Sequence, residues 1–109
     1  MAEAYKKLGQ GTLAGSAGLL YSPAADTEAV IKSINISNNT GTARTVTLYH
    51  TDHGATASDA DLILPGVEIE AGGFAEWEGT LCMAATEDIQ GFASQAGVIS
   101  YTIWGVEIT

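Results

Sequence analysis

The chain is poor in cysteine, proline and positive charge, and each shortage excludes a class of protein. Its 109 residues include one cysteine, two prolines and four Lys or Arg, against thirteen Asp or Glu. A lone cysteine cannot form a disulfide within the chain, which excludes a disulfide-stapled scaffold. The formal net charge of -9 argues against a nucleic-acid surface and an anionic membrane surface, because both require clustered basic residues. We therefore expect a partner that is a protein or is uncharged.

Long apolar segments are lacking as well. No run approaches the ~20 apolar residues that a membrane-spanning helix needs, and the opening MAEAYKKLGQG has no hydrophobic stretch of the kind found in signal peptides. At 109 residues the chain suits one domain that buries a single core without disulfides or metals. We expect Cys82, in the apolar segment LCMAA, to be a small buried hydrophobic residue.

Alternating side chains, typical of β-strands, fill the segments between turns. In residues 43–50, ARTVTLYH, every second residue from Val46 to His50 faces one side and the residues between them face the other. Thirteen glycines separate such segments, and only Ala2–Leu8 could begin a helix. The eight candidate strands are Gly18–Ser22, Glu28–Asn38, Ala43–Thr51, Asp61–Leu64, Val67–Ala71, Phe74–Glu78, Asp88–Ser94 and Val98–Ile108.

This pattern predicts an all-β fold, a single-domain antiparallel β-sandwich with a jelly-roll or an immunoglobulin-like strand order. The segment Gly9–Ala17 has too few large apolar groups to pack a core, so we expect residues 1–17 to form an N-terminal arm and residues 18–109 to form the sandwich. The loop Asp52–Ala60 should be exposed at one end. The segment Val98–Ile108 is apolar on both faces, as in a central strand or a strand that packs against another chain.

No residue pattern indicates a catalytic or metal site. His50, Asp52 and His53 are close in sequence, but neighbouring strand residues face opposite sides and no further Cys or His completes a ligand set. We expect His50 to end a core-facing row and His53 to lie in a loop. Four acidic residues that could pair as in a glycosidase are better explained as the polar faces of two strands: Glu68, Glu70, Glu76 and Glu78.

Nucleophile and phosphate-binding motifs are also lacking. No serine lies in a G-x-S-x-G context, and GQGTLAG has neither the Walker lysine nor a preceding strand. We predict that the chain is not an enzyme and uses no metal or cofactor.

Residues Leu20–His50 resemble one known class of protein. An opening LYSPAAD leads to a strand VIKSINISN, a turn of small residues and a strand TVTLYH, and the closing VISYTIWGVEI extends the similarity. These motifs resemble small structural proteins of tailed bacteriophages, which form β-sandwich or jelly-roll components of the head, neck or tail. The chain departs from them at Ser22–Asp26, where a valine and a glycine are more usual. The resemblance implies a virion protein that is made in the bacterial host cytoplasm and has no catalytic residues.

From this resemblance and the arm we expect a capsid decoration or cement protein that binds the major capsid protein or other virion proteins as a homo-oligomer, for example a trimer. A neck, tail or fibre component is one alternative. A carbohydrate-binding adhesion module with a platform of Trp77, Trp104 or Tyr49 is another, and a metal-assisted hydrolase using His50, Asp52 and His53 is a third.

Partner contacts are expected on the arm and at the two tryptophans. Lys6 and Lys7 place positive charge on the arm of an otherwise acidic chain. Trp77 and Trp104 suit either the core or a subunit interface, because large amphipathic rings are common in both. The candidate contact residues are Ala2, Tyr5, Lys6, Lys7, Leu8, Thr12, Trp77 and Trp104.

Overall fold

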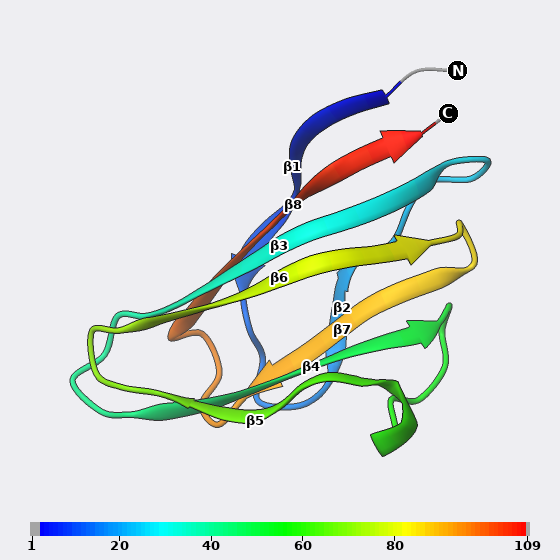
Figure 1. Cartoon of the computed structure of the whole chain (residues 1–109). Coiled ribbons are helices and arrows are strands. Elements are labelled where there is room, and N and C mark those ends of the chain that lie inside the picture. Colours follow the sequence, from blue (N-terminus) through cyan, green and yellow to red (C-terminus); the bar gives the residue numbers. More distant parts are fainter. Residues whose placement is uncertain (1–2, 109) are drawn as a thin grey trace.

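Two four-stranded antiparallel sheets stack face to face (Figure 1). The computed structural model describes residues 3–108, with side chains from residue 6 onward. Its strands are β1 (Glu3–Thr12), β2 (Gly18–Tyr21), β3 (Glu28–Asn38), β4 (Arg44–Asp52), β5 (Leu62–Ile69), β6 (Phe74–Met83), β7 (Glu87–Ala93) and β8 (Ile99–Ile108), with a short helix η1 (Asp59–Asp61) before β5. One sheet has the order β1-β8-β3-β6 and the other β2-β7-β4-β5. The predicted all-β sandwich is confirmed.

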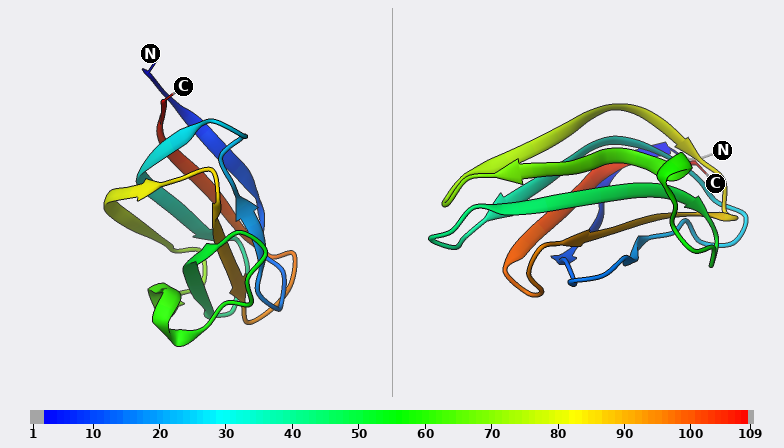
Figure 2. Two further views of the ribbon diagram at one scale, coloured as in Figure 1. Left: turned by 90° about the vertical axis from the view of Figure 1, so that its right-hand side faces the viewer. Right: turned by 90° about the horizontal axis from the view of Figure 1, so that it is seen from below.

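The strand pairing identifies the sandwich as a jelly roll. Strand β4 pairs with β5, β3 with β6, β2 with β7 and β1 with β8. This is the pairing of one long hairpin that is rolled up, so that its successive strand pairs alternate between the two sheets. Of the two strand orders that the sequence left open, the chain has the jelly-roll order. Figure 2 shows the curvature of both layers, and the start of β1 lies beside the end of β8, where Glu3 pairs with Ile108.

Isoleucine dominates the core between the sheets, as the alternation in sequence predicts. Strand β3 points every second residue inward until the ladder shifts between Ile31 and Ser33, after which Ile34 and Ile36 continue the inward row. A second shift lies in β1 between Lys7 and Gly9. Such bulges bend a sheet. The fully buried large side chains include Leu13, Ile31, Ile34, Ile36, Leu48, Ile89, Ile99 and Ile103.

The N-terminal segment differs from the predicted arm. Its described part, Glu3–Thr12, is an edge strand that pairs along its length with β8 of the same chain. The glycine-rich segment after it is anchored by Leu13, which is fully buried, donates its amide to the Ile99 carbonyl and accepts a bond from the Gly97 amide. A strand at a sheet edge is held mainly by backbone bonds, so it needs few large apolar side chains. The helix considered for Ala2–Leu8 is wrong, because residues 3–8 are strand.

Other strand boundaries also differ from the prediction. Two candidate strands around Pro65 form the single strand β5, in which Gly66 adopts a φ of 50°. Strand β6 runs on to Met83, five residues beyond its predicted end. Pro65 fits because β5 lies at a sheet edge, where one row of amides makes no ladder bonds. Within residues 3–108, no helix is long or apolar enough to cross a bilayer.

Candidate interaction surfaces

A row of paired residues crosses the outer face of the β1-β8-β3-β6 sheet. Lys7 of β1 pairs with Trp104 of β8, Trp104 with Ser33 of β3, and Ser33 with Glu78 of β6. Residues paired directly in this way place their side chains on the same face of a sheet. Lys7 and Glu78 are exposed at opposite edges, and Trp104 between them is 44% exposed. The row therefore runs from a basic edge over an aromatic ring to an acidic edge.

At the basic edge, the two lysines are held differently. Lys6 Nζ lies 2.6 Å from Glu107 Oε1, and the Tyr21 hydroxyl donates to Glu107 Oε2 at 2.9 Å. The hydrogen bond from Lys6 holds the pKa of Glu107 below its usual value, with a further contribution from Tyr21. Among the side chains that the structure describes, Lys7 Nζ donates only to the neutral amide oxygen of Gln10, at 2.7 Å. The positive charge of Lys6 is thus neutralised within the chain, whereas that of Lys7 faces solvent.

At the acidic edge, Glu76 and Glu78 share the outer face of β6, and both are exposed. A hydrogen bond and charge repulsion from Glu78 raise the pKa of Glu76 above its usual value. Repulsion between neighbouring carboxylates would be relieved by a cation next to them. Lys32 of the neighbouring strand β3 donates to the Thr80 hydroxyl of β6 at 3.3 Å.

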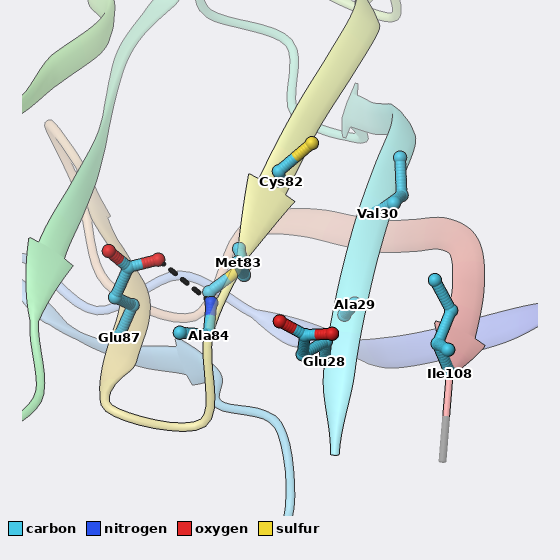
Figure 3. A pocket seen from close by; sticks show the side chains of 8 residues that line it. All are labelled: Glu28, Ala29, Val30, Cys82, Met83, Ala84, Glu87 and Ile108. Carbon is cyan, nitrogen blue, oxygen red and sulfur yellow. Dashed lines mark hydrogen bonds between the residues drawn. The ribbon is translucent and has the colours of Figure 1, made fainter.

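A hollow of about 370 Å³ opens where β3 begins and β6 and β8 end (Figure 3). Val30 and Ile108 form part of its apolar lining, and its two carboxylates belong to Glu28 and Glu87. Glu87 Oε1 accepts the Ala84 amide at 2.9 Å. Its lining contains no histidine that could act as a base for Cys82. The full lining is Glu28, Ala29, Val30, Cys82, Met83, Ala84, Glu87 and Ile108.

The prediction that Cys82 is buried is wrong. Its thiol is exposed on the outer face of β6, because it shares that face with Glu76 and Glu78 while Leu81 and Met83 face the core. The apolar neighbours in LCMAA belong to the opposite face of the same strand.

His50 and His53 do not form one site. His50 Nε2 lies 3.1 Å from Glu87 Oε1, while His53 Nδ1 lies 2.8 Å from Asp88 Oδ1. Among the described residues, no group of three or more His, Cys, Asp or Glu side chains is close enough together to hold a metal. The Ala84 amide, and then His50, hold the pKa of Glu87 below its usual value. Burial opposes ionisation of Asp88, but hydrogen bonds from the Gly54 amide and His53 outweigh it and lower its pKa.

The aromatic residues considered for a carbohydrate platform face different directions. Trp77 packs against the core, while Trp104 is on the outer face of one sheet. Tyr49 belongs to the other sheet, where its ring stacks on Phe92 with centroids 6.2 Å apart. These rings therefore do not form a shared flat surface.

The structure divides the predicted contact residues into two groups. Lys6, Lys7, Thr12 and Trp104 are exposed, whereas Leu8 and Trp77 pack against the core. Ala2 and the side chain of Tyr5 lie outside the described part of the chain.

The sequence did not indicate that Glu78 is a candidate interaction residue at a sheet edge. The alternation in FAEWE indicated that Glu76 and Glu78 face away from Trp77, but no sequence signal placed β6 at a sheet edge opposite β1. That position depends on which strands pair across the whole chain.

Comparisons with known proteins match the fold but not a sequence family. No family model and no curated protein matches the sequence. A chain of the Bacillus endospore appendages, described as disulfide-linked pili, is similar over 99% of this chain and 88% of its own, with a TM-score of 0.58 and 17% identity. A chain of the infectious bursal disease virus particle is similar over 96% of this chain, with a TM-score of 0.55 and 11% identity.

The coat protein of Tobacco streak virus is a third structural neighbour, with a TM-score of 0.51, 7% identity, and coverage of 96% of this chain and 83% of its own. The protein spans only 30% of the bursal disease virus chain. At these identities the likeness concerns the fold, and the neighbours that share it are viral capsid proteins and a pilus protein.

Proposed function

We propose that the protein is a structural component of a tailed-phage virion, a capsid decoration or cement protein that binds the shell as a homo-oligomer. Support comes from the jelly roll, which in the neighbouring structures belongs to a virus particle, a coat protein and a pilus. The phage-like motifs over Leu20–His50 point to the same kind of assembly. The protein would be made in the bacterial cytoplasm and would reside on the virion.

The observation that carries this proposal is the row from Lys7 to Glu78. A sheet that is basic at one edge and acidic at the other presents complementary surfaces to neighbouring subunits. Contacts made only in the assembled shell would stabilise it by mass action, since a ligand that binds only the assembled state shifts the equilibrium toward that state. The major capsid protein is the proposed partner, and a trimer is the proposed oligomer.

Copy number on purified particles tests the proposal. Quantitative mass spectrometry and cryo-electron microscopy of intact virions should find this chain on the head surface in hundreds of copies. Particles that lack the chain should lose their DNA at a lower temperature, and adding purified protein back should restore their stability. A virion without the chain would refute the proposal.

A neck, tail or fibre component is the second candidate, and the pilus likeness favours it. That neighbour is matched over most of its length and has a higher TM-score than the two viral proteins described above. A few copies or a few tens of copies per virion, located away from the head, would select this alternative. A carbohydrate-binding module has less support, because Trp77, Trp104 and Tyr49 do not share a face.

A further inference from the structure

The sandwich has four edge strands, and they differ in how readily another strand could pair with them. Strand β2 has four residues, and β5 is interrupted by Pro65 and by Gly66, whose φ is positive. Strands β1 and β6 have ten residues each and contain no proline, and β1 carries a single bulge, between Lys7 and Gly9. Short strands, prolines and bulges are the usual means of blocking an edge against pairing. The β1-β8-β3-β6 sheet therefore has two long edges, while the edges of the other sheet are protected.

The charges on these two long edges discourage pairing of like edges and favour pairing of unlike ones. Two β1 strands side by side would bring together lysines, and two β6 strands would bring together Glu76 and Glu78. Like charges directly opposite each other destabilise a strand pair, and opposite charges stabilise it. Strand β1 of one copy and β6 of another are the complementary combination.

The strand directions allow this pairing without any rearrangement. Neighbouring strands in β1-β8-β3-β6 are all antiparallel, so β1 and β6 run in opposite directions. A second copy shifted sideways along the hydrogen-bonding direction would place its β1 antiparallel to β6 of the first copy. The alternation of strand directions would continue unbroken from one copy into the next.

The register of the sheet identifies the residues that would meet. The row Lys7, Trp104, Ser33 and Glu78 reaches both edges, so extending it places Lys7 of the next copy beside Glu78. The adjacent row, which runs from Gln10 to Glu76, would place Gln10 beside Glu76. Lys7 can make this contact because, among the described side chains, its amine bonds only the neutral amide of Gln10, whereas Lys6 is paired with Glu107.

We propose that β6 of one copy pairs antiparallel with β1 of a second copy, with Lys7 opposite Glu78, so that their sheets join into one continuous sheet. This inference rests on the proposed function and names the contact by which copies associate. The contact joins two different edges, so its repetition generates either a closed ring or an open row of subunits.

A pair of engineered cysteines tests the register. Lys7→Cys and Glu78→Cys are combined with Cys82→Ser, and the protein is treated with a mild oxidant in solution and on particles. Within one chain the two positions are three strand spacings of ~4.8 Å apart, too far for an internal disulfide. Oxidation should give a ladder of linked chains in denaturing electrophoresis that collapses on reduction. The matched control combines Lys7→Cys with Glu68→Cys, an exposed position on β5 of the other sheet, and should give no ladder.

Charge reversal tests the contact itself. Lys7→Glu and Glu78→Lys should each weaken self-association roughly tenfold in sedimentation equilibrium, because each brings like charges together. Combining the two reversals should restore association to near the wild-type value, whereas the control Glu68→Lys should leave it unchanged. Circular dichroism on each variant verifies that the fold is retained.

The outcomes separate this inference from the proposed function. If the cysteine pair gives no more linked chains than the Glu68 control over the full concentration range, the β1–β6 contact is refuted, even when the chain is abundant on virions. If linked chains form in solution but the chain is absent from virions, the contact stands and the virion function is refuted. Failure of the double charge reversal to restore association would also overturn the proposed register.

Discussion

The two sheets of the jelly roll meet their surroundings in different ways. On the β2-β7-β4-β5 sheet, buried polar side chains bond the loop that follows β4: Gln90 donates to the Ala55 carbonyl at 2.9 Å, and Asp88 accepts the Gly54 amide at 3.0 Å. On the β1-β8-β3-β6 sheet, Trp104 is 44% exposed and both edges are long. We call the β2-β7-β4-β5 sheet the closed sheet, because its own chain covers it, and the β1-β8-β3-β6 sheet the open sheet. The closed sheet contributes mainly to folding, and the open sheet carries the proposed contact between copies.

Substitution of Gly105 should have the largest effect on stability. A side chain at this position of β8 would collide with the backbone carbonyl of Val30, which lies in the ladder between β3 and β8. Gly105→Ala should reduce the free energy of unfolding by about 3 kcal/mol or more, measured by urea denaturation. Gly41→Ala, where nothing lies within 4 Å, is the control and should have almost no effect; equal losses would contradict the collision at Gly105.

Loss of the Asn38 amide should be the next largest effect. This fully buried residue of β3 donates to the Thr42 and Ile69 carbonyls at 2.9 and 3.0 Å, which ties the open sheet to β5 of the closed one. Asn38→Ala removes this donor from the buried bond to the Ile69 carbonyl and from the partly buried bond to Thr42, and should cost about 2 to 3 kcal/mol. The exposed neighbour Asn39, changed to alanine, should cost far less in the same denaturation experiment.

Two single substitutions, one on each sheet, test the contrast between the closed and the open sheet. Gln90 bonds both Thr51 and Ala55 under the loop of the closed sheet, so Gln90→Ala should destabilise the fold by about 1.5 kcal/mol. Trp104→Ala on the open sheet should change folding stability by less than about 1 kcal/mol, while weakening self-association. Thermal melts and sedimentation on both variants would measure the two effects, and a reversed order would contradict the division of roles.

The acid response of Glu87 and Asp88 on β7 should have the opposite sign to that of Glu76 on β6. Glu87 and Asp88 have lowered pKa values in the folded chain, so the folded chain binds protons less readily there than the unfolded chain. Their stabilisation is complete above the ordinary values of 4.5 and 3.8 and is lost as the pH falls through the lowered folded values. Asp88→Asn should lower stability near pH 7 and make its dependence on pH shallower in acid, as followed by denaturation at a series of pH values.

Glu76 on the open sheet should behave in the opposite way. Its pKa is raised by Glu78, so its charged form disfavours the folded state, and proton uptake at the raised value favours that state. Glu76→Gln should give a small gain in stability at pH 7 that shrinks as the pH falls. A loss of stability at pH 7 would show that repulsion between the two carboxylates is not what raises the pKa.

Much of the sandwich was predictable because burial and alternation coincide in its central strands. The isoleucines of β3 and the row from Val46 to His50 belong to strands with partners on both sides, where one face must be apolar. Strand β1 was not predicted because its backbone is held at an edge and, of its described side chains, Leu8 is the large apolar one that packs against the core. The exposure of Cys82 was not predicted, because its apolar neighbours in sequence lie on the opposite face of β6.

The association surface was predictable only in its basic half. Lys6 and Lys7 stand out in an acidic chain, but the distinction between them depends on Glu107, about one hundred residues away in sequence. The role of Glu78 depends on the strand order, since alternation alone assigns the same exposed character to every outward carboxylate.

The pairing of Glu3 with Ile108 has a practical consequence. Residues opposite each other in an antiparallel pair lie ~5 Å apart, so a linker of a few residues could join these two positions and make the polypeptide circular. New ends could then be opened in the exposed loop after β4, giving a circular permutant that carries a fused cargo there. The jelly roll would then serve as a display scaffold whose attachment point can be moved from one end of the sandwich to another.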